Sequence, residues 1–240
     1  MNGTLEQIGK RVWHLPPHPD PEQVQSRVGV VVGNKETVLI DAGNTPRIAK
    51  TVLSELERIG APPVGKVIYT HHHWDHVFGS CVYGAEATAH TLCRTQLEME
   101  ALKPWSEAFL TEEVLRDPTL QGRAAILKRG VDWADFRVIV PDVIFETTYE
   151  MQGDGYRLEL KHVGGKHAED SVVVVVPDEK IMFLGDSFYP PPRRLRPLDE
   201  SFDMEMVGEF LLEDCEFYLD GHSEPFTKTD LATWFSESEA

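Results

Sequence analysis

The sequence predicts a sheet-rich, layered α/β domain. Segments with strand character occur in two groups, one within residues 26–69 and one within residues 143–185, and helical segments follow each group. This order favours sheets covered by helices on their outer faces over a doubly wound parallel sheet. The chain has 240 residues, of which 41% are hydrophobic, enough for one well-packed core, so we expect a single domain over residues 1–240.

The first group of strands begins with a predicted hairpin. Residues 26–32 (SRVGVVV) and 37–41 (TVLID) are rich in β-branched side chains, and Gly33-Asn34-Lys35 supply a turn between them. Residues 46–60 carry apolar side chains at helical spacing, with proline in the first turn and glycine at the end, which predicts an amphipathic helix. Residues 66–69 (KVIY) predict a short strand, so the polar segment after it lies on a loop at a strand end.

A helical insertion is expected between the two groups of strands. Residues 89–102 have helical character, and we assign the region 91–141 to a helical insertion or lid within the domain. Trp105, Phe109 and Trp133 lie in this region. These aromatic side chains either line an apolar pocket for an acyl chain or pack in the core.

The second group of strands contains two further predicted hairpins. Their turns are Gly153-Asp154-Gly155 and Pro177-Asp178-Glu179, each between segments of strand character. Residues 202–214 and 227–237 then read as helices. The chain thus returns to helices after its last strands, as a layered arrangement requires.

The charge of the chain argues against nucleic-acid binding. Its 23 basic and 40 acidic side chains give a net charge of −17 at neutral pH, which repels phosphate backbones. The N-terminal residues contain no apolar run typical of a signal peptide, and the longest aliphatic run, residues 172–176, is too short to cross a bilayer. Cys81, Cys93 and Cys215 form no CxxC pair, which fits a reducing compartment. We therefore expect a cytoplasmic protein with a small-molecule substrate and no nucleic-acid or membrane partner, and a homodimer is compatible with the sequence.

Residues 71–76, HHHWDH, place four histidines and one aspartate within six positions. In an extended segment alternate side chains share a face, so His71 and His73 point to one site while His72 points away. Asp75 and His76 follow where the chain turns. Imidazole and carboxylate groups together suit a divalent ion such as Zn²⁺.

Further candidate ligands stand at other strand ends. His167 precedes the strand-like run of valines, Asp186 ends the segment IMFLGD, and His222 follows the segment CEFYL. Because side chains from separate strand ends can converge, the sequence predicts one metal centre built from these residues and the cluster at 71–76. The remaining histidines have no comparable motif and are assigned to the surface or the core: His14, His18, His90 and His162.

The order of these motifs resembles the metallo-β-lactamase fold superfamily. The matching elements are residues 39–43 (LIDAG), 71–76 (HxHxDH), 165–167 (Gly-Lys-His), 184–186 (LGD) and 221–222 (Gly-His). The resemblance covers about residues 24–90 and 142–226, and it implies an αββα sandwich with a metal site at one edge of the sheets. In one departure, Glu169 stands where the family usually has proline, and Asp170 follows it.

The same resemblance implies a site for two divalent metal ions, zinc by preference, with iron or manganese as alternatives. It assigns the ligands as two triads and one bridging carboxylate: His71, His73 and His167 for one ion, Asp75, His76 and His222 for the other, and Asp186 between them. Asp41 is expected to orient the ligand loop from behind the ligands.

The function that the resemblance implies is hydrolysis of a carboxylic ester-type bond, in a lactone, thioester or related acyl substrate, by a metal-bridging hydroxide. A bridging Asp186 resembles the bridging residue of the lactonases, the glyoxalase II-type thioesterases and the phosphodiesterase branches rather than the residue found there in true β-lactamases. Asp75 would orient the nucleophile. Tyr189, at the spacing found in acyl-homoserine lactonases, would assist at the substrate carbonyl.

The basic segment after Tyr189 has two interpretations. Arg193, Arg194 and Arg196 either bind an anionic group of the substrate or pair with the acidic residues of segment 199–220.

Three other functions also stay open: a mononuclear iron persulfide dioxygenase of this fold, which uses only the three-histidine set, a small-nucleotide phosphodiesterase, and a non-catalytic metal-binding protein. A site with an open coordination position argues against the last, since structural metal sites are usually closed.

Overall fold

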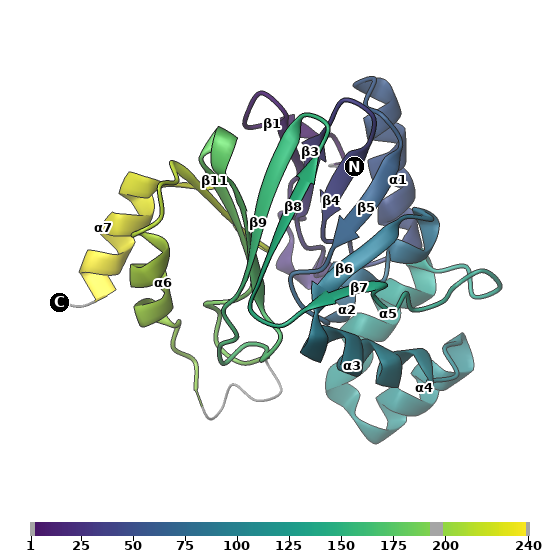
Figure 1. The fold of residues 1–240 in the computed structure, drawn as a ribbon. Coiled ribbons are helices and arrows are strands. Elements are labelled where there is room, and N and C mark those ends of the chain that lie inside the picture. The colour runs from purple at the N-terminus through teal and green to yellow at the C-terminus, as the bar shows by residue number, and fades with distance from the viewer. Residues whose placement is uncertain (1–2, 193–198, 239–240) are drawn as a thin grey trace.

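Two β-sheets lie face to face at the centre of the protein, in a computed structural model that describes residues 3–192 and 199–238. Helices cover the outer face of each sheet, so the layers run helix, sheet, sheet, helix (Figure 1). The predicted αββα sandwich is therefore confirmed.

The first sheet is built from the N-terminal part of the described chain, in the order β1-β2-β3-β4-β5-β6-β7. Its strands are β1 (Glu6–Gln7), β2 (Val12–Leu15), β3 (Val28–Val32), β4 (Thr37–Ile40), β5 (Val64–Ile68), β6 (Glu86–His90) and β7 (Val143–Phe145). Strands β1 to β4 pair antiparallel, and β4 to β7 pair parallel. The carboxyl ends of β4 and β5 consequently lie at one edge of the sheet.

The second sheet follows in the C-terminal part, in the order β13-β12-β11-β10-β9-β8. Its strands are β8 (Thr148–Gly153), β9 (Tyr156–His162), β10 (Val172–Val176), β11 (Ile181–Gly185), β12 (Phe217–Asp220) and β13 (Phe226–Thr227). Strands β11 and β12 are parallel, whereas the other neighbours pair antiparallel. Both hairpins predicted in this part of the chain, β8–β9 and β10–β11, are confirmed.

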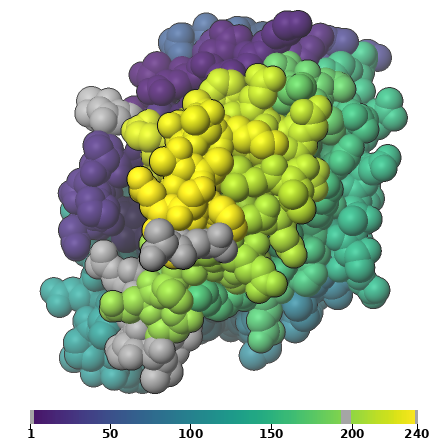
Figure 2. Space-filling model, turned by 90° about the vertical axis from the view of Figure 1, so that its left-hand side faces the viewer, coloured from purple at the N-terminus to yellow at the C-terminus, as the bar shows by residue number. Residues whose placement is uncertain are grey.

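The helices of the N-terminal half lie on the outer side of the first sheet, and those of the C-terminal half on the outer side of the second (Figure 1). They are α1 (Pro46–Arg58), α2 (Trp74–Val77), α3 (Thr91–Ala101), α4 (Glu107–Arg116), α5 (Gln121–Gly130), α6 (Met204–Phe210) and α7 (Lys228–Ser238). Figure 2 shows the face that carries α7, drawn in yellow, with N-terminal residues in purple along its border. In the described part of the chain, every helix is too short or too polar to span a lipid bilayer.

The helix predicted at residues 46–60 is confirmed, and its sequence explains its bounds. The Thr45 hydroxyl accepts a hydrogen bond from the backbone N–H of Ile48 (3.4 Å), and Pro46 occupies the first helical position. Val52 and Leu56, one turn apart, are buried against the first sheet. The hydrophobic stripe thus fixes the helix on the sheet beside the loop that carries the histidine cluster.

Strand β10 is buried on both faces, because it lies between two layers of the sandwich. Val172, Val174 and Val176 pack in the core between the sheets. Val173 and Val175 point the other way and pack under α6 and α7. Burial of each valine contributes about 1.5–3 kcal/mol, so this run of five supports both interfaces of the second sheet.

The structure corrects the sequence prediction at residues 86–90. These residues form β6, a buried parallel strand between β5 and β7, and the helix predicted over 89–102 begins only at Thr91. The His90 side chain caps that helix by accepting from the N–H of Leu92 (3.2 Å). The helix expected over 202–214 is shorter, Met204–Phe210, and β1 and β2 were not predicted. Strand β6 owes its form to β5 and β7, of which β7 is more than 50 positions away in the sequence.

Candidate metal centre

The candidate ligands lie where parallel strands of both sheets end. His71 follows β5, and Asp41 follows the adjacent strand β4. Asp186 follows β11, and His222 follows the adjacent strand β12. Because the sheets face each other, the two pairs of strand ends meet at one edge of the sandwich, and His167, which precedes β10, completes the ring.

Three histidines form one half of the centre, here called the three-histidine half: His71, His73 and His167. The Nδ1 atom of His73 lies 3.0 Å from Nε2 of His71 and 3.0 Å from Nε2 of His167. Two nitrogens bound about 2.1 Å from one tetrahedral ion would be about 3.4 Å apart. The three ring nitrogens are therefore already gathered at a separation close to that of a shared ion.

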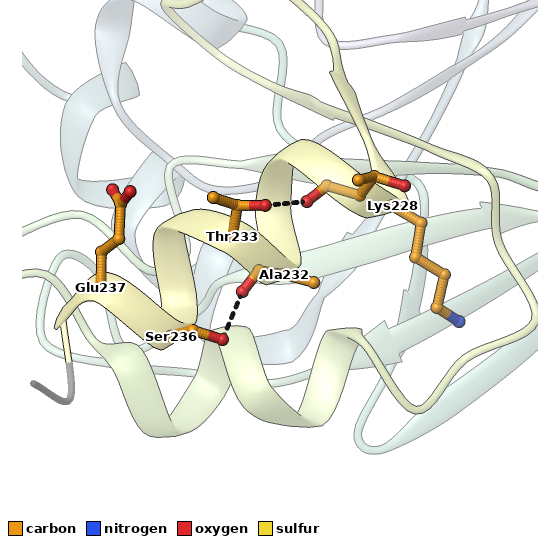
Figure 3. A pocket seen from close by; sticks show the side chains of 6 residues that line it. Lys228, Ala232, Thr233, Ser236 and Glu237 are labelled. Atoms are coloured by element: carbon orange, nitrogen blue, oxygen red, sulfur yellow. Dashed lines mark hydrogen bonds between the residues drawn. The ribbon is translucent and has the colours of Figure 1, made fainter.

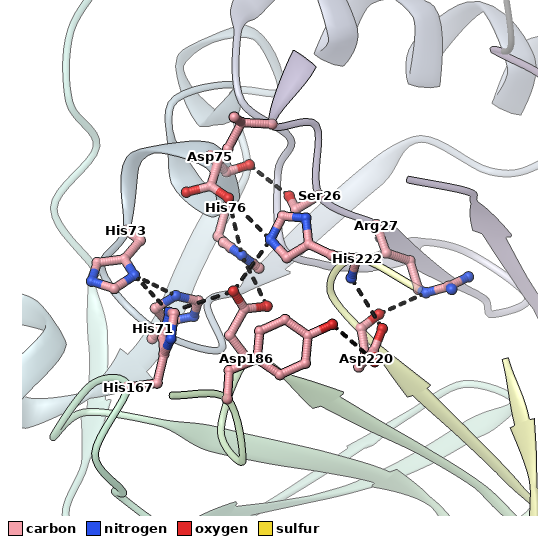
Figure 4. Close-up of polar contacts among 12 residues, drawn as sticks. Ser26, Arg27, His71, His73, Asp75, His76, His167, Asp186, Asp220 and His222 are labelled. Atoms are coloured by element: carbon pink, nitrogen blue, oxygen red, sulfur yellow. Dashed lines mark hydrogen bonds and ion pairs between the residues drawn. The ribbon is translucent and has the colours of Figure 1, made fainter. Parts of the chain in front are cut away.

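Asp75, His76 and His222 form the other half, here called the carboxylate half. The Oδ2 atom of Asp75 lies 3.5 Å from Nε2 of His76 and 3.3 Å from Nε2 of His222. Asp186 stands between the halves (Figure 4). Its Oδ2 is 3.4 Å from Nε2 of His167 and 3.2 Å from Nε2 of His222, while its Oδ1 is 3.4 Å from Nε2 of His76.

The donor set fits divalent metal ions. Nε2 of His76 and Oδ1 of Asp186 are buried and have no hydrogen-bond partner among the described residues, although they lie 3.4 Å apart. Leaving a buried donor or acceptor unpaired costs about 1–3 kcal/mol, more if it is charged. An ion ligated by both atoms would satisfy them, and nitrogen and carboxylate ligands are those that Zn²⁺ prefers.

Hydrogen bonds behind the ligands fix the direction of the imidazole rings. Asp41 accepts from the backbone N–H of Thr70 (2.8 Å), from the Thr70 hydroxyl (2.8 Å) and from Nδ1 of His76 (2.7 Å). The Thr70 hydroxyl in turn accepts from Nδ1 of His71 (3.1 Å), and Nδ1 of His167 donates to the Pro190 carbonyl (2.9 Å). In these three rings Nδ1 is the nitrogen that donates to the protein, so Nε2 is the nitrogen directed at the centre. The structure thus places Asp41 behind the ligand loop, where the sequence predicted it.

The two halves hold their protons differently. Burial, together with the neighbouring His76 and His73, lowers the pKa of His71 well below its ordinary value. Burial and the neighbouring His167 lower the pKa of His73 to about 3. Both rings are therefore neutral at physiological pH, and neutral imidazole is the form that binds metal.

The carboxylate half favours positive charge. Burial opposes protonation of His222, but Asp186 and Asp75 outweigh it and raise the pKa of His222 to about 10. Burial likewise opposes protonation of His76, and Asp186, Asp41 and Asp75 together raise its pKa well above the ordinary value. In the metal-free protein these protons neutralise the carboxylates, and a divalent ion would replace them.

Two glycines allow the backbone to approach the centre. Gly185 has φ +54°, a left-handed conformation that glycine adopts at little cost, and an added Cβ there would lie 2.6 Å from the Thr70 hydroxyl oxygen. At Gly221 an added Cβ would lie 2.1 Å from Oδ1 of Asp186 and 2.9 Å from Cε1 of His76. The motif LGD therefore needs glycine because a larger residue would occupy the space of Thr70 behind the ligands, and GH needs it because a larger residue would occupy the space of Asp186 and His76.

Sequence analysis missed Asp220, which organises the turn that carries His222. Its Oδ1 accepts from the backbone N–H groups of His222 (3.0 Å) and Ser223 (2.7 Å). The buried Arg27 donates from Nε to the Asp220 carbonyl (2.8 Å) and also contacts the Ser223 carbonyl and His14. The Asp-Gly pair before His222 is a turn signal that points to such a residue.

Tyr189 lies next to the centre but is engaged elsewhere. Its ring centroid is 6.1 Å from that of His167 and 6.1 Å from that of His222. Its hydroxyl donates to Oδ2 of Asp220 (3.0 Å), and burial together with this carboxylate raises the pKa of Tyr189. Its action on a substrate carbonyl stays a prediction. The three arginines at positions 193, 194 and 196 lie outside the described residues.

The insertion packs against the loop that carries the ligands. The ring of Phe78, which follows α2, is 5.0 Å from Trp105 and 5.3 Å from Phe136. Trp105 also contacts Phe109 (5.4 Å), and Trp133 contacts Phe136 (5.6 Å). Trp105 and Trp133 thus join the core under the first sheet, the second of the two arrangements considered from the sequence. The use of the insertion as a lid stays a prediction.

A shallow groove along α7 contains none of the candidate ligands (Figure 3). Its lining includes Thr233 and Ser236, whose hydroxyls donate to the helix carbonyls of Thr229 and Ala232 (2.9 Å each). Because these groups are already satisfied within the helix, the groove offers little polar recognition.

Comparison with known proteins gives relatives of the same fold. A linear primary-alkylsulfatase of Pseudomonas sp. (strain ATCC 19151) is 20% identical over 167 residues, 60% of this chain and 30% of that protein. The structure of the stereoselective inverting sec-alkylsulfatase Pisa1 from Pseudomonas sp. matches with a TM-score of 0.73 at 15% identity, covering 98% of this chain and 40% of Pisa1. A metallo-beta-lactamase from Pontibacter korlensis matches with a TM-score of 0.63 at 18% identity, covering 97% of this chain and 96% of the other. At these identities the likeness establishes the fold alone, and the chain spans less than half the length of either sulfatase.

The family model described as the metallo-beta-lactamase superfamily matches residues 21–228. This span includes both halves of the metal centre, the bridging position of Asp186 and all the strands that carry them. It confirms the family resemblance of the motifs and, at the level of the superfamily, the prediction of a metal-dependent hydrolase, while the branch stays a prediction. By its sequence and its fold, the chain belongs to the metallo-beta-lactamase superfamily.

Proposed function

We propose that this chain is a hydrolase with two metal ions that cleaves a carboxylic ester-type bond in a small molecule, such as a lactone or a thioester. Zinc is the proposed metal, because five imidazole nitrogens and two carboxylates form a ligand set typical of that ion. Ions held there would supply hydroxide at neutral pH, since a metal lowers the pKa of bound water from 15.7 to about 7.

The observation that carries the proposal is the position of Asp186. Its carboxylate is within 3.4 Å of a histidine from each half of the centre, so one side chain can serve both ions. A bridging carboxylate of this kind resembles the lactonase and thioesterase branches of the superfamily rather than true β-lactamases. A centre for one iron ion would need only the three-histidine half, and the complete carboxylate half therefore favours two ions.

The charge of the centre suits a reaction in which an oxyanion forms. Asp75, Asp186 and the adjacent Asp41 bring three carboxylates against the four positive charges of two divalent ions, so the loaded centre keeps a net positive charge. A preorganised positive site stabilises charge that develops on a substrate oxygen. The net charge of −17 on the rest of the chain favours a small substrate over a polyanion. The three cysteines are free, and Cys93 and Cys215 are buried, which supports the proposed reducing cytoplasm.

Asp75 and Tyr189 are the proposed catalytic side chains. The Ser26 hydroxyl donates to the backbone carbonyl of Asp75 (2.6 Å), and this hydrogen bond fixes the backbone that carries the Asp75 carboxylate. Asp75 is therefore placed to orient the nucleophile. Tyr189 can serve a substrate oxygen only by leaving Asp220, and its raised pKa keeps the proton on its hydroxyl.

The variant Tyr189→Phe tests this role. We expect a loss of about 10²-fold in kcat with KM little changed, the loss typical of one oxyanion donor. An unchanged kcat would assign the hydroxyl to support of the Asp220 turn. Steady-state kinetics at saturating zinc distinguish the two outcomes.

Sulfate ester hydrolysis is a second candidate, favoured by the relatives. The linear primary-alkylsulfatase and Pisa1 are sulfatases by name, and Pisa1 shares this fold. An electropositive centre also suits a sulfuryl group. At 20% and 15% identity, however, the likeness leaves the substrate of this chain to experiment.

A substrate panel on the zinc-loaded protein tests the proposal. It contains a homoserine lactone, a glutathione thioester, a primary alkyl sulfate, a β-lactam and an aryl phosphodiester, with Asp186→Ala as the matched blank. Turnover of the lactone or thioester that is lost in the variant supports acyl hydrolysis. Turnover of the alkyl sulfate alone would replace it with the second candidate, and turnover of the phosphodiester alone would move the assignment to phosphoryl chemistry. Oxygen consumption by an iron-loaded sample with a persulfide substrate would instead identify a dioxygenase.

A further inference from the structure

His72 stands between two candidate ligands but faces the opposite way. Its ring belongs to none of the groups whose atoms converge on the centre. Instead its Nδ1 donates to Oδ1 of Asp170 at 2.8 Å, the donor being the imidazole because a carboxylate only accepts. The contact joins residues 98 positions apart in the chain.

This hydrogen bond connects the two loops that build the three-histidine half. One loop supplies His71 and His73, which flank His72 directly. The other supplies His167, three residues before Asp170. A second link between the same loops is the backbone N–H of Val172, which donates to the carbonyl of Thr70 (2.8 Å). The loops are thus fastened at Thr70 by the backbone and at His72 by side chains.

Asp170, which accepts this hydrogen bond, is buried. Only 1% of the residue is exposed, and its Oδ2 has no hydrogen-bond partner among residues 3–192 and 199–238. A buried carboxylate with few partners is costly unless one strong contact holds it. The His72 imidazole supplies the strong contact at Oδ1, with 25% of that side chain exposed, and the buried Cys93 thiol also lies against this carboxylate.

We propose that His72 and Asp170 form a latch that holds the two loops at the separation the three-histidine half requires. The latch positions His71, His73 and His167 and itself touches neither metal nor substrate. The latch gives a role to His72, the histidine between the ligands His71 and His73. It also gives a role to Asp170, the acidic residue three positions after His167. The inference rests on the proposed metal centre but not on which bond the protein cleaves.

The experiment measures zinc affinity of the metal-free protein by competition with a chromophoric chelator. We compare the parent protein with His72→Ala, Asp170→Ala and the double variant. Each single change should weaken zinc binding about 10- to 100-fold, the usual effect of losing a partner behind a ligand. The double variant should be no weaker than the poorer single variant, because both changes remove the same contact.

Two further variants separate positioning from general loss of structure. His72→Asn places an amide N–H near the position of Nδ1 and should restore most of the affinity, even if His72→Ala folds poorly. His162→Ala is the matched control, since Nε2 of His162 also donates to the same loop, at the Glu169 carbonyl (2.8 Å), and its loss should leave zinc affinity unchanged. The absorption spectrum of the Co²⁺ form reports whether the ligand geometry has changed.

Parent-like affinity in His72→Ala, or losses that add in the double variant, would overturn the latch. An equal loss in His162→Ala would also overturn it, because any loosening of the loop would then suffice. A parent protein that binds no divalent ion would overturn the metal centre together with the latch. The proposed centre and the proposed latch thus fail in distinguishable ways.

Discussion

The two halves of the metal centre hold their ligands ready in different ways. In the three-histidine half, burial and crowding keep His71 and His73 neutral, so their lone pairs are free. In the carboxylate half, Asp75 and Asp186 outweigh burial and keep His222 protonated. Burial therefore decides the protonation state of these histidines in the first half, and the carboxylates decide it in the second. An ion can therefore bind His71 and His73 without displacing a proton, whereas it must displace protons from His76 and His222.

Asp186 is the side chain that joins the halves, so its loss has the largest expected effect. In Asp186→Ala both ions lose a ligand, and hydrolysis should fall by at least about 10²–10³-fold. Metal analysis after dialysis should find fewer than two ions per chain. Two tightly held ions in this variant would mean that the halves are independent sites.

Variants that each remove one ligand should empty one half of the centre and leave the other half occupied. His73→Ala removes the nitrogen that lies 3.0 Å from both its partners, and the three-histidine half should lose its ion. His222→Ala should instead empty the carboxylate half. Each variant should retain about one ion per chain in metal analysis, because each half keeps its own remaining ligands. Loss of both ions from either variant would contradict this division and show that one ion cannot bind without the other.

Gly221→Ala tests the carboxylate half by adding a methyl group beside its ligands without removing any of them. The added Cβ would lie 2.1 Å from Oδ1 of Asp186, so this carboxylate or the turn must move. We expect weakened binding of the second ion and a loss of about 1–3 kcal/mol in the free energy of unfolding from overpacking. Thermal unfolding and metal analysis measure both effects. Gly84→Ala serves as a control for overpacking, since nothing lies within 4 Å of its added Cβ, although its φ of +63° carries the strain of a left-handed residue.

The number of protons released on zinc binding should differ between the two halves, although this effect is smaller than those above. Because the pKa of His222 is raised from 6.5 to about 10 and that of His76 is also raised, zinc binding at pH 7.5 should release protons from these rings. His71 and His73 are already neutral and should release none. Calorimetric titrations in two buffers of different ionisation enthalpy count the protons. No release on filling both sites would contradict the difference in charge.

The same shifts set the pH dependence of the metal-free fold. A histidine whose pKa is raised in the folded state stabilises that state fully below its unfolded pKa. The contribution of His222 should thus be present below pH 6.5 and be lost as the pH rises through about 10. Unfolding of the metal-free protein across this range checks the sign, and His222→Ala should weaken the dependence while the part contributed by His76 remains.

Local patterns predicted the elements that carry the ligands. The hairpin of β3 and β4, helix α1 and the hairpins of the second sheet have apolar runs, alternating patterns or helical hydrophobic spacing, each bounded by turn residues. The motif order placed His71, His73, Asp75, His76, His167, Asp186 and His222 in one centre, and the structure brings these seven together. Strand β6 was missed, because residues 86–90 take strand form through pairing with β5 and β7, and Ala89 and His90 pair with β7 alone.

The residues behind the ligands were harder to predict than the ligands themselves. Asp41 was identified through a family motif, whereas Asp170 and Asp220 were not assigned a role. Asp170 meets His72 across 98 residues, and Asp220 acts through Tyr189 and the backbone of the His222 turn. The contact of Asp170 depends on how loops from two sheets come together, and no local pattern encodes it. The bonds from Asp220 to the backbone of the His222 turn are local, and the Asp-Gly turn signal was the sequence feature that could have identified them.

The most direct test of the account is anomalous diffraction at the zinc edge from crystals of the zinc-loaded protein. The account predicts two peaks, about 3.5–4 Å apart as in other two-metal sites. One should lie among His71, His73 and His167, the other among Asp75, His76 and His222, with Asp186 between them. A single peak in the three-histidine half at saturating zinc, or a peak bound by His72, would contradict the two-ion centre on which the proposed hydrolysis depends.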